Sequence, residues 1–171
     1  EHWPCPSHSS AANKPTPVTG PSGLKMEGPY DWVPPSYWLQ DSERGGAFGF
    51  ASEISPGPAP PPLESLRRML GPGHAWPPDD VWRLHCGLQE FHSIEIFRQA
   101  LGSRYGEPRS LADFAMKSQL VTYEAERAMF EGYARNKYLA TGVIHRMLND
   151  AWPSLIWHLY DWYLRPGGGY F

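Results

Sequence analysis

Apolar positions recur at helical spacing in the carboxy-terminal half of the chain. In residues 93–101 (SIEIFRQAL), one helical face collects the apolar side chains of Ile94, Phe97 and Leu101. Residues 110–113 (SLAD) resemble a capping box, which predicts a long helix from there to about Ala134. Its apolar face would carry Leu111, Phe114, Val121 and Ala125. We expect both helices to pack on a sheet.

Two other segments are typical of strands. Residues 46–54 (GAFGFASEI) are rich in small and aromatic residues and stop at the break SPGP, which predicts a short buried strand ending near Glu53. Residues 141–148 (TGVIHRML) predict a second strand.

Two further helices complete the predicted order of elements. Pro62 suits the first turn of a helix that runs through Leu70. Residues 153–164 (PSLIWHLYDWYL) predict a last helix, ended by Pro166 and three glycines. The order strand, helices, strand, helix predicts an α/β fold made of βα units with inserted helices.

Proline and aromatic residues give the chain its unusual composition. Sixteen of the 19 prolines fall in the first 80 residues, which predicts long loops there, because proline disrupts helix interiors and central strands. Trp, Tyr and Phe make up 14% of the 171 residues. Such content suggests a large core or flat surfaces on which sugar rings stack.

Charge and cysteine usage argue against several other classes. The formal charge is −3 with no run of Lys or Arg, and no apolar stretch approaches the roughly 18 residues of a membrane helix, so we expect neither nucleic acid nor membrane as partner. Cys5 and Cys86 are too few for a disulfide scaffold. His85, Cys86 and His92 have a spacing that matches no common metal site, so we expect no metal.

Glu53 is the outstanding candidate for chemistry. It is the only ionisable group in residues 48–53 (FGFASE), at the predicted carboxyl end of a strand. Catalytic acids of βα architectures lie at such ends. Taken alone, such a glutamate is more often a loop cap or a salt-bridge partner, because many loops carry acids and few acids catalyse.

Four segments together resemble a known family, the exo-β-D-glucosaminidase and β-mannosidase-like branch of glycoside hydrolase family 2. They are residues 17–38 (PVTGPSGLKMEGPYDWVPPSYW), 47–58 (AFGFASEISPGP), 97–105 (FRQALGSRY) and 140–163 (ATGVIHRMLNDAWPSLIWHLYDWY). The combination of GPYDWVPP with FGFxSE is typical of the exo-glucosaminidase-like branch. The closing xLNDxWPSxxW pattern is shared with β-mannosidases.

The resemblance implies a fold and an activity. Residues 1–171 would form the later part of a catalytic (β/α)8 TIM barrel, with Glu53 as the nucleophile of a retaining glycosidase. The substrate would be a carbohydrate with a terminal β-linked amino sugar, most like chitosan oligosaccharides, and the hydrolysis needs no metal or cofactor. The family also suggests secretion or a periplasmic location.

The second carboxylate of such a mechanism is not found in the sequence. Only 52 residues precede Glu53, and none of them forms an acidic motif of the family's type. A complete barrel needs about 250 residues. We therefore expect a piece of a longer chain, whose earlier part holds the acid/base residue, the first barrel strands and any β-sandwich domains. Alone, the piece should be inactive and prone to aggregation, because its sheet edges are open.

Alternatives to the glucosaminidase reading stay open at this point. A β-mannosidase shares the closing pattern and the position of the nucleophile. A noncatalytic carbohydrate-binding relative would fit the aromatic content. Sugar binding without turnover would distinguish the second alternative from both enzymes.

Several aromatic and acidic residues are candidates for substrate binding. Tyr30, Asp31 and Trp32 lie in GPYDW, which the resemblance places in an active-site loop. Tyr30 or Trp32 would line the sugar site, and core packing is an equal alternative. Trp152 resembles the family's aromatic after the last strand, although the start of an apolar helix would also suit it as a core residue.

One position departs from the family pattern. Relatives commonly carry an aromatic pair, often Tyr-Trp, where this chain has His145 and Arg146 before Met147. If Arg146 faces the site, it replaces a flat apolar ring by a cation. Such a change removes stacking and repels the ammonium group of an amino sugar.

Overall fold

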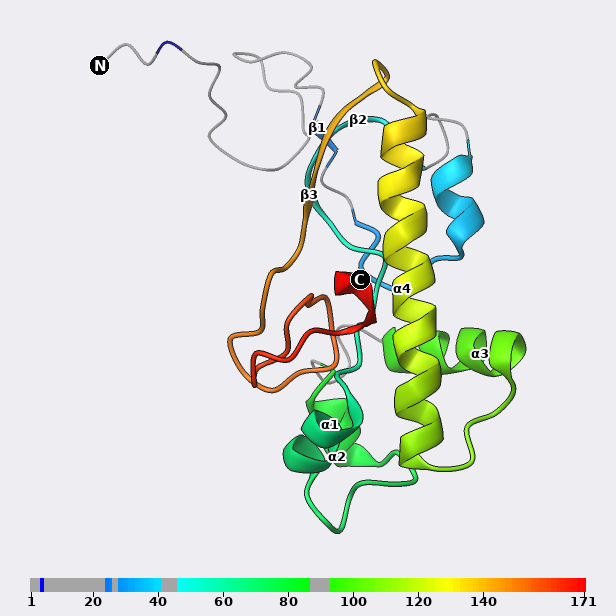
Figure 1. The fold of residues 1–171 in the computed structure, drawn as a ribbon, viewed down its shortest axis with the longest axis vertical. Coiled ribbons are helices and arrows are strands. Elements are labelled where there is room, and N and C mark those ends of the chain that lie inside the picture. Colours follow the sequence, from blue (N-terminus) through cyan, green and yellow to red (C-terminus); the bar gives the residue numbers. More distant parts are fainter. Residues whose placement is uncertain (1–3, 5–23, 26–27, 41–45, 87–92) are drawn as a thin grey trace.

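The computed structural model describes the chain except for residues 1–3, 5–23, 26–27, 41–45 and 87–92 (Figure 1). Its elements, in chain order, are β1 (Leu24–Lys25), the 3₁₀ helix η1 (Pro35–Leu39), β2 (Gly49–Ile54), α1 (Leu63–Leu70), α2 (Asp80–Leu84), α3 (Ser93–Tyr105), α4 (Leu111–Arg135), β3 (Ala140–His145) and the 3₁₀ helix η2 (Gly168–Tyr170). Within the described part of the first 80 residues, proline-rich connections separate short elements, as the composition predicts.

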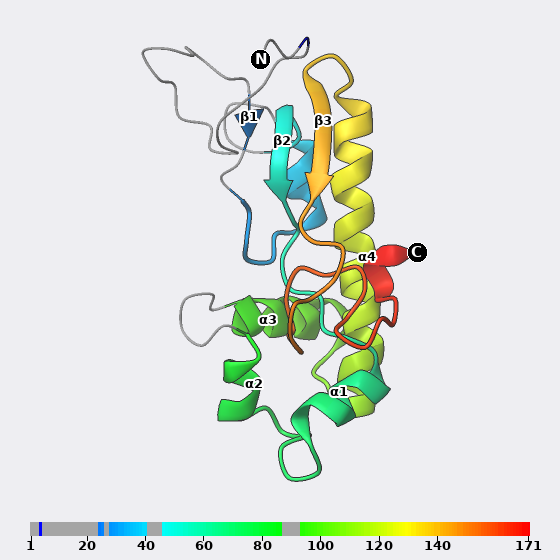
Figure 2. The ribbon, with the colours of Figure 1, turned by 90° about the vertical axis from the view of Figure 1, so that its left-hand side faces the viewer.

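The described strands form one parallel sheet, in which β2 lies between β1 and β3 (Figure 2). Phe50 of β2 faces Leu24 on one side and Gly142 on the other. Parallel neighbours need a crossover, and helices α1 to α4 form the crossover from β2 to β3. The strand–helices–strand part of the predicted order is therefore confirmed.

The two predicted strands are present with different bounds and burial. The second strand ends at His145, three residues earlier than predicted. β2 is only partly buried, with Ala51 and Ile54 buried and Phe50 exposed, so the expectation of a fully buried strand is wrong. The pattern of aromatic and small residues predicted the strand correctly, but it did not predict which side chains are buried.

The long helix α4 packs against two separate hydrophobic clusters. In Figure 1 it runs beside the strands at one end and beside α1 and α3 at the other. The sheet-side cluster joins η1, β2, α4 and β3 through Trp38, Ala47, Ala51, Ile54, Met129, Tyr133 and Ala140. A Cβ on Gly132 of α4 would lie 2.8 Å from the carbonyl oxygen of Trp38, so glycine permits the close approach of η1 to the helix.

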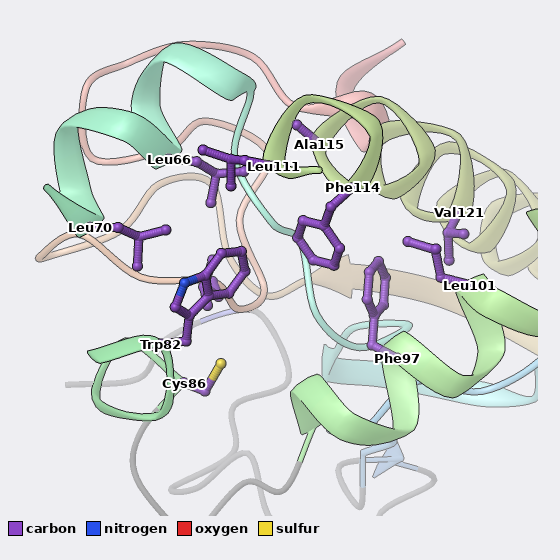
Figure 3. Close-up of a cluster of buried hydrophobic side chains, with 11 residues drawn as sticks. Leu66, Leu70, Trp82, Cys86, Phe97, Leu101, Leu111, Phe114, Ala115 and Val121 are labelled. Carbon is purple, nitrogen blue, oxygen red and sulfur yellow. The ribbon is translucent and has the colours of Figure 1, made fainter. Parts of the chain in front are cut away.

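The helix-side cluster joins α1, α2, α3 and the first half of α4 (Figure 3). Its buried members are Leu66, Leu70, Trp82, Cys86, Phe97, Leu101, Leu111, Phe114, Ala115, Val121 and Leu155. The face predicted for α3 is therefore correct for Phe97 and Leu101. Its partner is α4 and not the sheet, which corrects the expectation that both helices lie on the sheet.

Side-chain caps start two of the helices where the sequence places them. The hydroxyl of Ser110 accepts a hydrogen bond from the backbone N–H of Asp113 at 3.2 Å, as the capping motif predicts. The carboxylate of Asp79 accepts one from Val81 at 3.0 Å and so begins α2. Helix α1 follows Pro62 and ends at Leu70, as predicted.

The helix predicted over residues 153–164 is wrong, because this segment is irregular. Its backbone groups bond to other loops: Leu155 N donates to His85 O at 3.0 Å, and Tyr160 N donates to Leu148 O at 2.8 Å. Residues 154–158 are all buried, without helical alternation. The segment is apolar because loops surround it on several sides. The spacing of apolar residues alone cannot distinguish such a segment from a helix with one apolar face.

Candidate active site

The carboxyl ends of β2 and β3 bring Glu53 and Arg146 together. Glu53 is the penultimate residue of β2, and Arg146 directly follows β3. The backbone N–H of Arg146 donates a hydrogen bond to the carbonyl of Ile54 at 2.8 Å, which holds the two strand ends side by side. Parallel strands end at the same edge of a sheet, which in βα folds is the edge that carries functional groups.

Glu53 has two charged or polar partners at this edge. An ion pair joins the guanidinium Nη1 of Arg146 to Oε1 of Glu53, and the side chains are 38% and 24% exposed. Tyr30, from the loop after β1, brings its hydroxyl near the Glu53 carboxylate. Burial raises the pKa of Tyr30, and the negative charge of Glu53 raises it further, so the phenol stays protonated as a donor.

Trp157 connects these partners from the irregular carboxy-terminal segment. Its indole N–H donates to the carbonyl of Tyr30 at 2.8 Å, and the two rings lie 5.5 Å apart. The guanidinium carbon of Arg146 lies 5.0 Å from the centre of the Trp157 ring, which is a cation–π contact. We call Glu53, Tyr30, Arg146 and Trp157 the Glu53 cluster.

Sequence reasoning missed Trp157, although a signal for it was present. Both Trp152 and Trp157 lie in the closing LNDAWPSLIW pattern, and only the first was selected. The predicted helix over 153–164 concealed the second, since it made Trp157 one apolar residue among many. Trp157 instead has φ = 63°, a left-handed conformation that turns the chain at this point.

Asp31 and Trp32 follow Tyr30 but have other neighbours. Trp32 packs against the helix-side cluster, which favours the core alternative for this residue. A Cβ on Gly57 would lie 2.5 Å from the backbone N and Cα of Trp32, so the loop after β2 supports the backbone of the Tyr30 loop. Asp31 Oδ1 is buried without a hydrogen-bond partner in the described part of the chain.

Trp152 lies outside the Glu53 cluster. The residue is 44% exposed, and its ring stacks on His85 with a centroid distance of 5.2 Å and an interplanar angle of 21°. His85 Nδ1 lies 2.7 Å from the carbonyl oxygen of Pro153, which fixes that ring at the end of α2. The expected packing of Trp152 into a core at a helix start is therefore wrong, and its role in sugar binding stays a prediction.

His145 and Arg146 face opposite sides of the sheet edge. Arg146 reaches Glu53, whereas His145 Nε2 lies 2.6 Å from Oε1 of Glu126 in α4. Burial raises the pKa of the Glu126 carboxyl, and the hydrogen bond to His145 partly offsets that rise. Of the two positions that depart from the family pattern, Arg146 alone faces the candidate nucleophile.

No part of the described chain gathers three or more His, Cys, Asp or Glu side chains in a manner that could hold a metal ion. Cys86 is buried, and burial raises the pKa of its thiol to about 12. Cys5 and His92 lie outside the described residues. None of the described helices is both long enough and apolar enough to cross a membrane.

Known proteins resemble the whole of the chain. It is 45% identical to an exo-β-D-glucosaminidase of Streptomyces avermitilis and 43% identical to one of Hypocrea jecorina, in each case over 99% of this chain and 20% of the relative. The crystal structure of the Amycolatopsis orientalis exo-chitosanase CsxA matches 94% of this chain with a TM-score of 0.79 and 39% identity. The resemblance to the exo-β-D-glucosaminidase branch of glycoside hydrolase family 2 is therefore confirmed.

The similarity of the chain to the mannosidase side of the family is weaker. A mannosylglycoprotein endo-β-mannosidase of Lilium longiflorum is 26% identical over 79% of the chain. The β-D-mannosidase of Dictyoglomus thermophilum shares the fold, with a TM-score of 0.69 and 22% identity. No protein-family model matches the chain. The chain spans about a fifth of the length of the exo-β-D-glucosaminidases it matches.

Proposed function

We propose that this chain supplies the nucleophile-bearing part of a retaining exo-β-D-glucosaminidase that removes terminal glucosamine from chitosan oligosaccharides. Residues 1–171 would form the later part of its (β/α)8 barrel. The observation that carries the proposal is the position of Glu53 at the carboxyl end of a parallel strand, with the hydroxyl of Tyr30 near its carboxylate. The names of the relatives supply the substrate class.

Glu53 would act by double displacement. A carboxylate oxygen attacks the anomeric carbon while the bond to the departing oxygen breaks, which gives a covalent glycosyl-enzyme. A second carboxylate, about 5 Å from the first in retaining enzymes, protonates the departing oxygen and then removes a proton from the water that attacks the intermediate. We assign that residue to the part of the longer protein that precedes this chain.

Tyr30 and Trp157 would hold the nucleophile in place. The hydroxyl of Tyr30 fixes the rotation of the Glu53 carboxylate, and the indole N–H of Trp157 fixes the backbone of Tyr30. Such positioning matters because attack requires the oxygen within about 3.5 Å of the anomeric carbon, in line with the leaving group.

Glu53→Gln in the full-length protein tests the proposal. We expect turnover of p-nitrophenyl β-D-glucosaminide to fall at least about a thousandfold, because the amide cannot form the ester intermediate. A 2-fluoro glycoside trap should label Glu53, as read by mass spectrometry of the peptide. Glu95→Gln, on an exposed carboxylate of α3, is the matched control. Near wild-type turnover of Glu53→Gln, or a label on another carboxylate, would refute the assignment.

Two alternatives have distinct outcomes in the same assays. A β-mannosidase would hydrolyse p-nitrophenyl β-D-mannoside faster than the glucosaminide. A noncatalytic sugar-binding relative would bind chitosan oligosaccharides without turnover or labelling. The ion pair between Arg146 and the Glu53 carboxylate favours this second alternative, because a carboxylate held by a cation is a weaker nucleophile.

A further inference from the structure

Arg146 places a fixed positive charge on the candidate nucleophile. Its guanidinium pairs with Oε1 of Glu53 and lies over the Trp157 ring, so contacts on two sides hold it there. Trp157 is itself buried and bonded to the Tyr30 backbone. The contacts with Glu53 and Trp157 therefore hold the partly exposed guanidinium at the strand edge.

We infer that Arg146 is a specificity-determining residue, which lowers the preference for a positive charge on C2 of the terminal sugar without abolishing the hydrolysis of glucosaminides. The inference rests on the proposed function, because it needs Glu53 to attack the anomeric carbon. Attack brings that carbon to within about 3.5 Å of a Glu53 oxygen, and C2 is its direct neighbour. A substituent on C2 thus lies within several ångströms of the guanidinium bound to the same carboxylate.

The size of the effect follows from charge and exposure. A glucosamine carries an ammonium group on C2, whereas a glucoside carries a neutral hydroxyl, and the two sugars are otherwise alike. Two cations at about 5 Å repel each other appreciably at an effective dielectric constant near 20, and less where water screens them. Because the Arg146 side chain is 38% exposed, we expect about a tenfold effect on relative rates and not a larger one.

The charged groups around the site do not reproduce this selectivity. Glu53 attracts an ammonium group, but it is unchanged in every Arg146 variant and its charge is paired with Arg146 in the wild type. Glu126 and His145 form their own buried pair on the α4 side of the sheet. Among the described residues that contact Glu53, Arg146 alone carries a positive charge.

The test compares two p-nitrophenyl substrates, the β-D-glucosaminide and the β-D-glucoside, in the full-length protein at a pH at which the amine is protonated. The measured quantity is the ratio of kcat/KM for the glucosaminide to kcat/KM for the glucoside. We expect Arg146→Gln and Arg146→Trp each to raise this ratio about tenfold, and Arg146→Lys to leave it near the wild-type value. Arg165→Gln, on an exposed arginine paired with Glu64, is the matched control.

The lysine variant separates charge from packing. A purely structural role for Arg146 would change both rates together in all three variants and leave the ratio unchanged. A glutamine variant whose ratio stays within about twofold of wild type, or a lysine variant that raises the ratio as much as glutamine does, overturns the inference while the hydrolase proposal stands. If wild type and variants hydrolyse neither glycoside and the 2-fluoro trap leaves Glu53 unlabelled, both proposals fail together.

Discussion

His145 Nε2 lies 2.6 Å from Oε1 of Glu126, and the two side chains are only 6% and 5% exposed. The contact joins the end of β3 to the middle of α4, on the side of the sheet opposite to Glu53. The next residue, Arg146, pairs with Glu53. Two consecutive residues therefore belong to different environments: His145 to a buried structural pair and Arg146 to the candidate active site.

Glu126→Gln should change how stability depends on pH. Burial raises the pKa of Glu126 in the folded protein, so the folded state binds more protons than the unfolded state between the two pKa values. This contribution to stability is complete below the ordinary glutamate pKa of about 4.3 and is lost as pH rises through the folded pKa. Glutamine has no such proton to lose.

Amide hydrogen exchange of α4 and β3 in the full-length protein measures the pH dependence of stability around Glu126. We expect the opening free energy of the wild type to fall as pH rises above about 4.3, and that of Glu126→Gln to stay flatter. Glu131→Gln, on an exposed carboxylate of the same helix, serves as the control. Parallel profiles for wild type and Glu126→Gln would contradict the prediction.

Gly57→Ala should displace the loop that carries Tyr30. Gly57 has φ = 116°, and an added Cβ would meet backbone atoms of Trp32 at 2.5 Å, so neither the conformation nor the space accepts a side chain. We expect a loss of about 2 kcal/mol or more in stability, together with reduced turnover. Gly73→Ala is the control, because nothing lies within 4 Å of its added Cβ. Equal unfolding midpoints for the two variants would show that the close approach is unimportant.

Tyr30→Phe should weaken catalysis while the fold is kept. The variant retains the ring beside Trp157 and loses only the hydroxyl near Glu53, which we expect to donate to the carboxylate during attack. A hydrogen bond to a charged group is worth about 1.5 to 3 kcal/mol, so kcat/KM should fall by about ten- to a hundredfold. Tyr138→Phe, at a highly exposed tyrosine, should leave kcat/KM unchanged. Unaltered steady-state kinetics of Tyr30→Phe would remove Tyr30 from the site.

His158→Leu should destabilise the carboxy-terminal segment. His158 Nδ1 lies 2.7 Å from Oδ2 of Asp150, and both side chains are completely buried, so the variant leaves a buried carboxylate without its partner. Such a loss costs about 3 kcal/mol or more. Its unfolding midpoint should fall far more than that of His74→Leu, whose pair with Asp79 is about half exposed. Similar midpoints for the two variants would mean that Asp150 gains water or another donor.

Helices with an apolar face and a cap could be predicted from the sequence, and irregular buried segments could not. Ser110 and the spacing of Phe114 and Val121 predict α4 because one helix face and one capping oxygen determine it locally. Residues 153–164 are covered by loops distant in the sequence, which a local pattern does not record. The partner of α3 was misassigned for the same reason, since periodicity defines an apolar face but not what covers it.

Some residues of the candidate site could likewise be predicted from the sequence, and others could not. Glu53 could be selected because it is an isolated acid at a strand end, and Tyr30 because it lies in the GPYDW segment. Trp157 was missed because its role depends on a left-handed turn and on a bond to a carbonyl 127 residues away. That Arg146 faces Glu53 whereas His145 faces α4 depends on how β3 ends against β2, which the sequence does not specify.

Helix α4 extends about 37 Å at 1.5 Å per residue and forms a wall of both hydrophobic clusters. If α4 detaches from one hydrophobic cluster, the apolar side chains of the other cluster also become exposed to water. Unfolding at the far end, among α1, α2 and α3, is therefore transmitted to the strands that carry Glu53 and Arg146. The two cores behave as one cooperative unit, and the integrity of the candidate site depends on packing that lies two helical turns and more away from it.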